Sequence, residues 1–293
     1  MTLPRRVIVF GGTGQLGREL GRMAPAGVEV TLLGRAAGDV RHPDEVAAAM
    51  HRTSAELVIN AAAYTAVDRA EADTDAAFDV NAVGAGHVAE AAAARGLRLL
   101  HVSTDFVFDG ERAQPYAPDA TPCPLGVYGA SKLDGERRVQ SALGDRAAIV
   151  RTAWLYEGEG PSFVHTILRL LATREVVNVV SDQVGTPTWA RGLARALWRI
   201  AECPQISGPL HWTDAGVASW YDFAVAIREE ALQAGVLKQA APVRPIATSE
   251  YPTAARRPPF SVLDKASTWR ALDLPPVHWR ENLRCMLAEL PRG

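Results

Sequence analysis

The sequence predicts an α/β fold in which a doubly wound parallel sheet is followed by a smaller domain of mixed helices and strands. Short apolar runs alternate with segments of helical periodicity through the first half of the chain. A glycine-rich turn directly follows the first of these runs. Past Trp154 the chain is divided by prolines into shorter segments, and all seven tryptophans lie from residue 154 onward. This change in texture indicates a second, more irregular domain.

The expected strands are short runs rich in Val, Ile and Leu, and they lie at 6–10, 28–33, 56–60, 97–103 and 147–154. Continuous rather than alternating hydrophobicity is typical of parallel strands that are buried on both faces. Helices are expected between and after the strands at 15–23, 43–52, 75–94 and 125–143. Right-handed crossovers through such helices produce a doubly wound sheet.

The second half is expected to contain helices at 162–173, 190–202 and 219–234 between short strands. We therefore expect one domain at 1–155 and a smaller mixed α/β domain at 156–293, from which some segments return to the first.

Composition excludes several classes of protein. The chain has 293 residues, of which 48% are hydrophobic and 22% charged, so it can bury a large core and is neither disordered nor fibrous. A net charge of −2 argues against a nucleic-acid or membrane-surface partner. Cys123, Cys203 and Cys285 lack the spacing of a metal site, and no apolar window approaches the roughly 20 residues of a membrane span. We expect a cytoplasmic protein with reduced thiols and no metal.

The glycine turn at 11–17 reads GGTGQLG and contains the Gly-x-Gly-x-x-Gly pattern at Gly12, Gly14 and Gly17, with Gly11 before it. Glycines let backbone N–H groups approach a diphosphate at a helix N-terminus. Because the turn follows a buried strand and opens a helix, it predicts a Rossmann-type dinucleotide site rather than a purely structural turn.

Cofactor preference depends on the end of the second strand. The sequence there ends in Arg35 without an adjacent carboxylate, which favours a 2′-phosphate and hence NADPH. NADH remains possible, because a solvated loop charge is the less favoured alternative for Arg35. Asp39 and Val40 are expected beside the adenine.

Tyr128 and Lys132 lie four residues apart in YGASK on a predicted helix, so both side chains share one face. Only three lysines occur among the 31 basic residues, which makes an accidental pair a poor explanation. A nearby ammonium group favours the anion of a phenol, so Lys132 is expected to lower the pKa of Tyr128. An exposed Tyr beside a solvated Lys is the alternative.

The fourth expected strand ends in Ser103, Thr104 and Asp105, where open α/β sheets hold their ligands. One of these hydroxyls could donate a hydrogen bond to a carbonyl oxygen that gains charge. Capping of the strand end is the alternative.

The motifs together resemble the extended short-chain dehydrogenase/reductase superfamily and, within it, the dTDP-4-dehydrorhamnose reductase family. Those that carry the resemblance are NAAAYTAVDRAE at 60–71, STDFVFDG at 103–110, PLGVYGASKLDGE at 124–136, RTAWLY at 151–156, DQVGTPT at 182–188 and RPPFSVLD at 257–264. The resemblance implies NAD(P)H-dependent reduction of the C4 ketone of a dTDP-4-keto-6-deoxy sugar, with the cofactor in the first domain and the sugar nucleotide mainly in the second.

The resemblance also implies roles for individual residues. Tyr128 would donate the proton, Lys132 would bind the nicotinamide ribose, and Thr104 would be the third catalytic residue. The expected cofactor contacts are Gly11, Gly14, Gln15, Leu16, Gly17, Arg35, Asp39, Val40, Ala62, Ala63, Tyr64, Thr65, Tyr128 and Lys132. The expected substrate contacts are Val67, Thr104, Asp105, Trp154 and Arg257. For Trp154, core packing is an alternative. Arg257 is added because the substrate diphosphate requires a cation, although a structural salt bridge is nearly as plausible.

Two departures from the family pattern leave questions open. Phe106 replaces a usual Tyr near the sugar, so another dTDP-4-keto sugar of an antibiotic pathway is an alternative substrate. Some relatives dimerise through Mg2+ held by glutamates, but here Arg191 accompanies Glu19 and Glu289. An arginine would repel Mg2+ and could pair with both carboxylates, so we predict no metal and leave monomer and homodimer open.

Two other classes of function are alternatives to a reductase. A non-catalytic NADP-binding regulatory subunit is disfavoured by the intact Thr104, Tyr128 and Lys132. A sugar-nucleotide epimerase or dehydratase is also disfavoured, since dehydratases of this superfamily tend to carry an Asp-Glu pair where this chain has Asp105 and Phe106.

Overall fold

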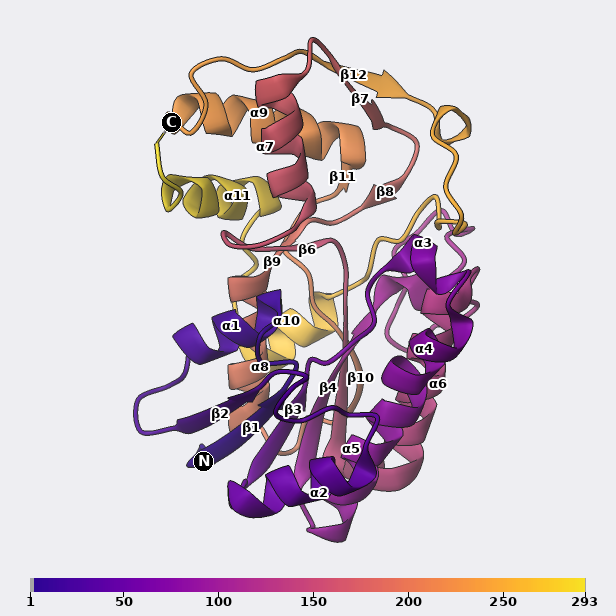
Figure 1. Cartoon of the computed structure of the whole chain (residues 1–293), viewed down its shortest axis with the longest axis vertical. Helices are drawn as coiled ribbons and strands as arrows, with labels where there is room; N and C mark the ends of the chain where they lie inside the picture. The colour runs from indigo at the N-terminus through magenta and orange to yellow at the C-terminus, as the bar shows by residue number, and fades with distance from the viewer. Residues whose placement is uncertain (1–2, 293) are drawn as a thin grey trace.

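The computed structural model describes residues 3–292 and is built around one six-stranded sheet (Figure 1). All of its strands are parallel, in the order β10-β5-β4-β3-β1-β2. The strands are β1 (Arg6–Phe10), β2 (Glu29–Leu33), β3 (Leu57–Asn60), β4 (Arg98–Thr104), β5 (Ala147–Thr152) and β10 (Gly208–His211). The predicted Rossmann-type parallel sheet is therefore confirmed.

Helices cover both faces of the sheet, because successive side chains of a strand point to opposite faces. Val7 and Val9 of β1 pack in one core with α1 and α8, whereas Ile8 and Phe10 pack in another with α2, α5 and α6. The bounds are α1 (Gln15–Arg22), α2 (Pro43–Arg52), α5 (Gly84–Ala94), α6 (Val127–Leu143) and α8 (Ala190–Glu202). Two apolar faces per strand explain the continuous hydrophobic runs.

The predicted single helix over 75–94 is wrong, because the segment is interrupted. It consists of α4 (Thr74–Phe78), a π-helical turn η1 (Asp79–Val83) and α5. Within the turn, the amide of Asn81 accepts from the backbone N–H of Tyr64 at 2.8 Å and donates to Ser131 Oγ at 3.0 Å. The widened turn thus ties this segment to the chain that follows β3 and to α6, which carries Tyr128 and Lys132.

Two segments of the second half return to the sheet. Helix α8 packs against α1, and β10 pairs with β5 at the sheet edge. No strand was predicted at 208–211, because Pro209 weakens the pattern. At an edge, a proline without an N–H is tolerated.

Helix α10 (Ala266–Leu272) also packs beside α8, and most of the rest of the second half lies above the sheet in Figure 1. Its core gathers side chains of three helices, α7 (Phe163–Thr173), α9 (Trp220–Gln233) and α11 (Trp279–Ala288). Short strand pairs join them: β6 (Leu155–Tyr156) with β9 (Thr188–Trp189), β8 (Val184–Gly185) with β11 (Ala218–Ser219), and β7 (Val177–Val180) with β12 (Val243–Ile246). The remaining short helices are α3 (Val67–Ala70), η2 (Asp105–Val107), η3 (Gly144–Arg146) and η4 (Thr248–Glu250). Among residues 3–292, none of the helices is long and apolar enough to cross a membrane.

Candidate functional site

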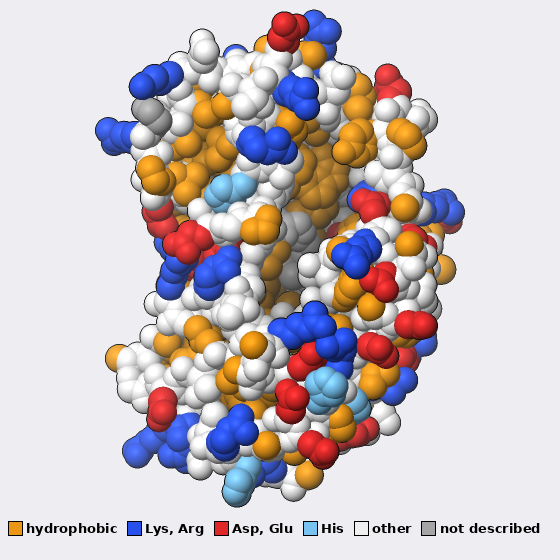
Figure 2. All heavy atoms as spheres, viewed as in Figure 1, with side chains coloured by type: hydrophobic (Ala, Val, Ile, Leu, Met, Phe, Trp, Pro, Cys, Tyr) orange, Lys and Arg blue, Asp and Glu red, His pale blue; other side chains and the backbone are white. Residues whose placement is uncertain are grey.

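A cavity of about 670 Å³ lies between the sheet and the second half, and Figure 2 shows the deep hollow there. One side, here called the floor, consists of the glycine turn 11–17, residues 102–105 at the end of β4, Tyr128 and Lys132. The opposite side, here called the roof, consists of Trp154, Leu155, Pro161, Trp220 and Arg257. The predicted site residues that line this cavity are Gly11, Gly14, Gln15, Leu16, Gly17, Ala63, Thr65, Val67, Thr104, Asp105, Tyr128, Lys132, Trp154 and Arg257.

The glycine turn crosses tightly between β1, β2 and β3. Gly11 has a φ of +80°, and a Cβ there would lie 2.5 Å from the backbone of Ala61. A Cβ at Gly17 would lie 2.4 Å from the Gly11 carbonyl oxygen. Helix α1 begins at Gln15, and its N-cap residue Gly14 makes no side-chain hydrogen bond to the first N–H groups of the helix. The free backbone N–H groups of such a turn can bind the oxygens of a diphosphate.

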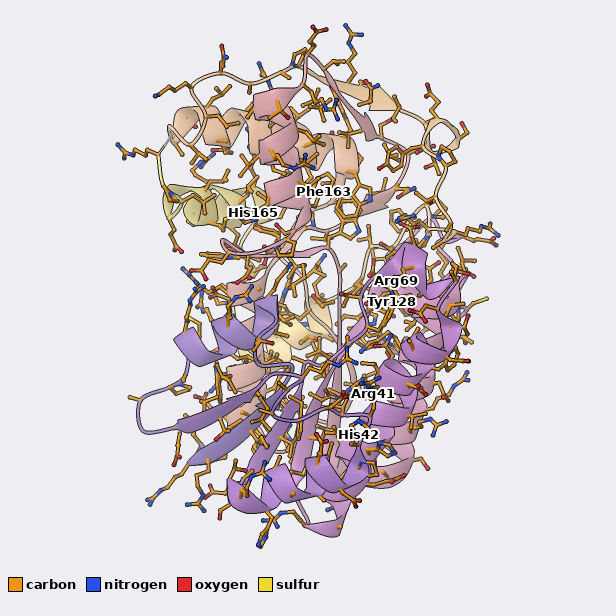
Figure 3. The ribbon with its side chains drawn as sticks, viewed as in Figure 1. Arg41, His42, Arg69, Tyr128, Phe163 and His165 are labelled. Carbon is orange, nitrogen blue, oxygen red and sulfur yellow. The ribbon has the colours of Figure 1, made fainter. Side chains whose placement is uncertain are left out.

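At the end of β2, Asp39 is paired with two arginines. Arg35 Nε lies 3.2 Å from its carboxylate and Arg41 Nη2 lies 2.6 Å from it. The hydrogen bonds from Arg41 hold the pKa of Asp39 well below its usual range. Arg41 (Figure 3) was missed by the sequence analysis, although its position two residues after Asp39 was a usable signal. The Arg35 side chain is 75% exposed, and both Arg35 and Asp39 lie outside the cavity lining.

Val40 has a buried side chain and also lies outside the lining. Its carbonyl oxygen is 3.0 Å from His87 Nδ1. Only its backbone could therefore border an adenine.

After β3 the chain is extended, and its side chains alternate in direction. Ala63 and Thr65 line the cavity, whereas Ala62 and Tyr64 do not. The hydroxyl of Tyr64 instead lies 3.3 Å from a carboxylate oxygen of Asp73. The structure thus brings only part of this predicted cofactor segment to the cavity.

Tyr128 and Lys132 lie one turn apart on α6, and both face the cavity. Lys132 is buried, and its Nζ donates to the Val102 carbonyl oxygen of β4 at 2.7 Å. The ring of Tyr128 meets Phe106 edge to face at 5.5 Å. In Figure 3 Tyr128 lies in the lower part of the molecule with the sheet, whereas Phe163 lies in the upper part with the second half of the chain.

Protonation of this pair differs from the sequence-based expectation. Burial raises the pKa of Tyr128 to about 12, and a hydrogen bond with Thr104 only partly offsets this rise. Burial lowers the pKa of Lys132 to about 8, against the raising effect of Glu136. The predicted lowering of the Tyr128 pKa is therefore wrong for this structure, because desolvation dominates. At pH 7 the phenol is neutral and the lysine carries its charge.

Thr104 and Asp105 form a hydrogen-bonded pair at the end of β4. Thr104 Oγ1 donates to the Asp105 carboxylate at 3.0 Å and accepts from the Phe106 backbone N–H at 3.2 Å. Burial raises the pKa of Asp105 to about 6, while a hydrogen bond from Ser261 opposes the rise. Ser261 comes from the second half and was missed, although it lies within the RPPFSVLD stretch.

Two stacked tryptophans form much of the roof. Trp154 has a φ of 47°, which a non-glycine residue rarely adopts. Its indole lies parallel to that of Trp220 at 3.5 Å, and a Cβ at Gly185 would lie 2.7 Å from it. Phe163 packs on Trp220 at 4.5 Å. Trp220 also lines the cavity and was missed, because only the tertiary structure brings α9 to this place.

Arg257 forms an ion pair across the mouth of the cavity. Its two Nη atoms donate to the carboxylate of Asp68 on α3 at 3.0 and 2.6 Å. The Asp68 carboxylate also accepts from the backbone N–H of Ala255 at 3.1 Å, and the bonds from Arg257 lower the pKa of Asp68. The salt bridge weighed as an alternative is thus present, and Arg257 still lines the cavity.

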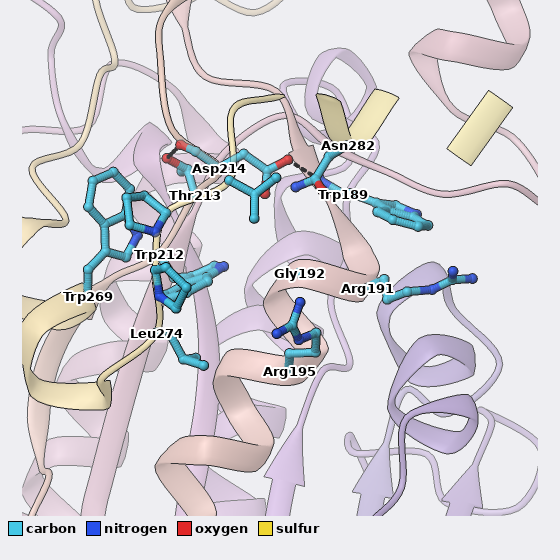
Figure 4. Close-up of a pocket in the computed structure, with 13 residues that line it drawn as sticks. Trp189, Arg191, Gly192, Arg195, Trp212, Thr213, Asp214, Trp269, Leu274 and Asn282 are labelled. Carbon is cyan, nitrogen blue, oxygen red and sulfur yellow. Dashed lines mark hydrogen bonds between the residues drawn. The ribbon is translucent and has the colours of Figure 1, made fainter. Parts of the chain in front are cut away.

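Arg191 extends from the start of α8 toward α1 (Figure 4). Its Nε lies 3.0 Å from a Glu19 oxygen, and its Nη2 lies 2.8 Å from a Glu289 oxygen. The predicted pairing of Arg191 with both carboxylates is confirmed. Within residues 3–292, no group of three or more His, Cys, Asp or Glu side chains is placed to hold a metal.

Arg191 also borders a second cavity, of about 60 Å³, with Trp189, Trp212 and Asp214 (Figure 4). None of the predicted catalytic, cofactor or substrate residues lines this small space. The larger cavity is therefore the candidate active site.

The parallel sheet, the glycine turn and the gathering of Thr104, Tyr128 and Lys132 at the strand ends define an extended short-chain dehydrogenase/reductase. Comparison with known proteins narrows this class. Residues 5–292 match the family described as RmlD substrate binding domain. The chain is 38% identical to the dTDP-4-dehydrorhamnose reductase of Aggregatibacter actinomycetemcomitans, with 95% of this chain and 97% of that protein covered. It therefore belongs to the dTDP-4-dehydrorhamnose reductase family.

Two further relatives bear on specificity and cofactor. A probable dTDP-4,6-dihydroxy-2-methyloxan-3-one 4-ketoreductase of Streptomyces antibioticus is 41% identical, with 95% of this chain and 93% of that protein covered. The crystal structure of the dTDP-4-dehydrorhamnose reductase of Bacillus anthracis in complex with NADP has a TM-score of 0.91 at 33% identity. That match covers 99% of this chain and 100% of the other.

Proposed function

We propose that this protein reduces the C4 ketone of dTDP-4-dehydro-L-rhamnose to the alcohol of dTDP-L-rhamnose, with NADPH as the preferred cofactor and NADH as a possible one. The relatives named for this reaction and the NADP-bound neighbour support the proposal. The observation that carries it is the meeting of Thr104, Tyr128 and Lys132 in one cavity with the glycine turn. The reduced nicotinamide supplies the hydride.

The side chains of the floor supply the proton that the ketone oxygen gains. Tyr128 donates its phenolic proton to the ketone oxygen as that oxygen gains charge. A pKa of about 12 keeps the phenol in the donor form at neutral pH. Thr104 Oγ1 can turn its hydrogen from Asp105 toward the same oxygen, which stabilises the developing charge. The Lys132 ammonium binds the nicotinamide ribose and compensates the phenolate that forms.

The residues present fit the cofactor. At Gly11 and Gly17, side chains would collide with backbone, so the turn leaves its N–H groups accessible to the diphosphate. Gly14, Gln15 and Leu16 meet the diphosphate in this proposal, Arg35 meets the 2′-phosphate, and the segment 62–65 meets the inner half of the cofactor. The adenine lies beside Asp39 and Val40.

The two domains divide this work in the proposal: residues 1–155 bind the cofactor, and residues 156–293 bind most of the sugar nucleotide. Val67, Asp105 and Trp154 contact the sugar, and Arg257 contacts its diphosphate. Because Arg257 already pairs with Asp68, substrate binding must compete with that carboxylate. A cytoplasmic location suits the cofactor and the three free cysteines.

A second candidate is 4-ketoreduction of another dTDP-deoxysugar in antibiotic biosynthesis. Phe106 favours it, because its ring contacts Tyr128 and offers no hydroxyl to the sugar. The relative from Streptomyces antibioticus supports this alternative. The floor would perform the same chemistry on either sugar.

Turnover measured with enzymatically prepared dTDP-4-dehydro-L-rhamnose tests the proposal. We expect stoichiometric loss of NADPH absorbance and formation of dTDP-L-rhamnose, identified by NMR. Cofactor binding without oxidation would contradict this substrate, and a panel of dTDP-4-keto sugars would then test the second candidate. Failure with every sugar in that panel would favour a regulatory subunit.

A further inference from the structure

A short segment of the second half lies across the glycine turn. Residues 157–161 follow β6, and three side chains of α1 hold them. Gln15 Nε2 donates to the Pro161 carbonyl oxygen at 2.7 Å. Arg18 Nη2 donates to the buried carboxylate of Glu157 and, at 3.1 Å, to the Glu159 carbonyl oxygen. Arg22 Nη2 lies 2.5 Å from the Glu159 carboxylate.

Among these side chains, Arg18 has an additional contact with the turn itself. Its Nη1 donates to the Thr13 carbonyl oxygen at 2.5 Å, and Thr13 lies between Gly12 and Gly14. The guanidinium therefore sits directly beside the N–H groups that face a cofactor diphosphate. Its Nε is buried and has no hydrogen-bond partner within the described chain. Buried donors are normally paired, so Arg18 has a hydrogen-bond donor that the described chain leaves unused.

The charges around the cavity give Arg18 a specific position. The basic residues among those that line it are Arg18, Lys132 and Arg257. Lys132 is bonded to β4 near Tyr128, and Arg257 is bonded to Asp68 at the mouth. Arg18 is thus the basic residue of this lining that lies at the glycine turn. A cofactor diphosphate carries two negative charges, and arginine binds such oxyanions through its planar fork.

We propose that Arg18 is a cofactor-binding residue whose guanidinium contacts the diphosphate of bound NADPH or NADH, in competition with its ion pair to the Glu157 carboxylate. This inference rests on the proposed use of NAD(P)H. Arg18 contacts a part that both cofactors share, whereas Arg35 lies at the end where they differ. Arg18 therefore contributes to the affinity for both cofactors. It also joins the segment 157–161 to the glycine turn that binds the diphosphate.

Cofactor titrations of the full chain test this role. Arg18→Gln keeps a polar side chain that can donate hydrogen bonds but removes the charge. We expect it to raise the Kd of NADPH and of NADH by the same factor, about tenfold. Arg22→Gln is the matched control, because Arg22 lies on the same helix and contacts the same segment without lining the cavity. It should leave both Kd values within about twofold.

Glu157→Gln separates cofactor binding from a purely structural ion pair. Removing the competing carboxylate leaves more of the Arg18 charge for the diphosphate, so both Kd values should fall, and an unchanged or raised Kd would contradict the proposal. An equal rise in Arg18→Gln and Glu157→Gln would overturn the proposal, and so would unchanged affinity in Arg18→Gln. If Arg18→Gln fails to fold, the direction of the Glu157→Gln effect decides alone.

The same titrations distinguish a failure of this inference from a failure of the proposed function. A wild-type chain that binds neither cofactor would refute the proposed function itself. A wild-type chain that binds NADPH but reduces no keto sugar would remove the catalytic proposal and leave the role of Arg18 intact.

Discussion

The floor and the roof of the cavity are built in different ways. The floor consists of strand ends and of helices packed on the sheet, and its functional side chains are held by contacts with the backbone, such as that of Lys132 Nζ with Val102. The roof consists of short segments held by side-chain contacts such as the Trp154–Trp220 stack and the Arg257–Asp68 pair. In the proposed function the floor performs the chemistry, whereas the roof selects and retains the substrate.

The largest expected effect is that of Tyr128→Phe on the floor. Removing the proton donor should lower kcat by roughly a hundred- to ten-thousandfold, while the Kd of NADPH changes little. Turnover and cofactor titration on the same preparation measure both quantities. Near-normal turnover would show that another group donates the proton.

The second prediction concerns the charge of Lys132. Its pKa is lowered to about 8, so the ammonium group is present below that pH and is lost as the pH rises through it. Activity should therefore decline by up to about tenfold per pH unit above this value. The Tyr128 phenol, with a pKa of about 12, stays protonated over the same range.

Lys132→Arg is the control for this pH profile, since guanidinium keeps its charge in alkaline solution. The decline should disappear from whatever activity that variant retains. A decline at the same pH in Lys132→Arg would assign it to another group.

The roof should behave in the opposite way. Trp220→Leu removes the indole that stacks on Trp154, and we expect KM for the sugar nucleotide to rise about tenfold. The Kd of NADPH and the pH profile should remain close to those of the wild type. A loss confined to kcat would show that the roof takes part in the chemical step.

The smallest effect is expected at the exposed end of the cofactor site. Arg35→Ala should weaken NADPH about threefold, because a surface charge contributes little free energy, and should leave NADH nearly unchanged. Arg41→Ala is the matched variant on the other side of Asp39. Equal losses for both cofactors in Arg35→Ala would remove Arg35 from the 2′-phosphate site.

Much of the floor was predictable from sequence, because each part of it is contiguous in the chain. The glycine turn, the Tyr128–Lys132 pair and the end of β4 each lie within one strand, turn or helix, and sheet geometry brings strand ends together. What local patterns could not give was the balance of electrostatic effects. Burial raises the pKa of Tyr128 more than its neighbours lower it.

The roof was predictable only in part, because its contacts join distant segments. Trp220 reaches the cavity through the packing of the second half, and no local pattern marks it. Ser261 reaches Asp105 in the same way, and only its place in the RPPFSVLD stretch could have indicated it. Trp154 was found through the family resemblance and Arg257 through the charge of the expected substrate, but the pairing of Arg257 with Asp68 depends on the tertiary structure. In the sheet, the edge strand β10 was not predicted, because Pro209 interrupts its hydrophobic pattern.

The most direct test of the reaction assigned to the floor follows one hydrogen atom. NADPH carrying deuterium at both hydrogen positions of the reactive carbon of its nicotinamide is incubated with the wild-type protein and dTDP-4-dehydro-L-rhamnose, and the product is analysed by NMR. We expect deuterium at C4 of the sugar and at no other carbon, with the hydroxyl proton coming from Tyr128 and hence from solvent. Deuterium at another carbon, or a product without deuterium, would contradict direct reduction of the C4 ketone on this floor.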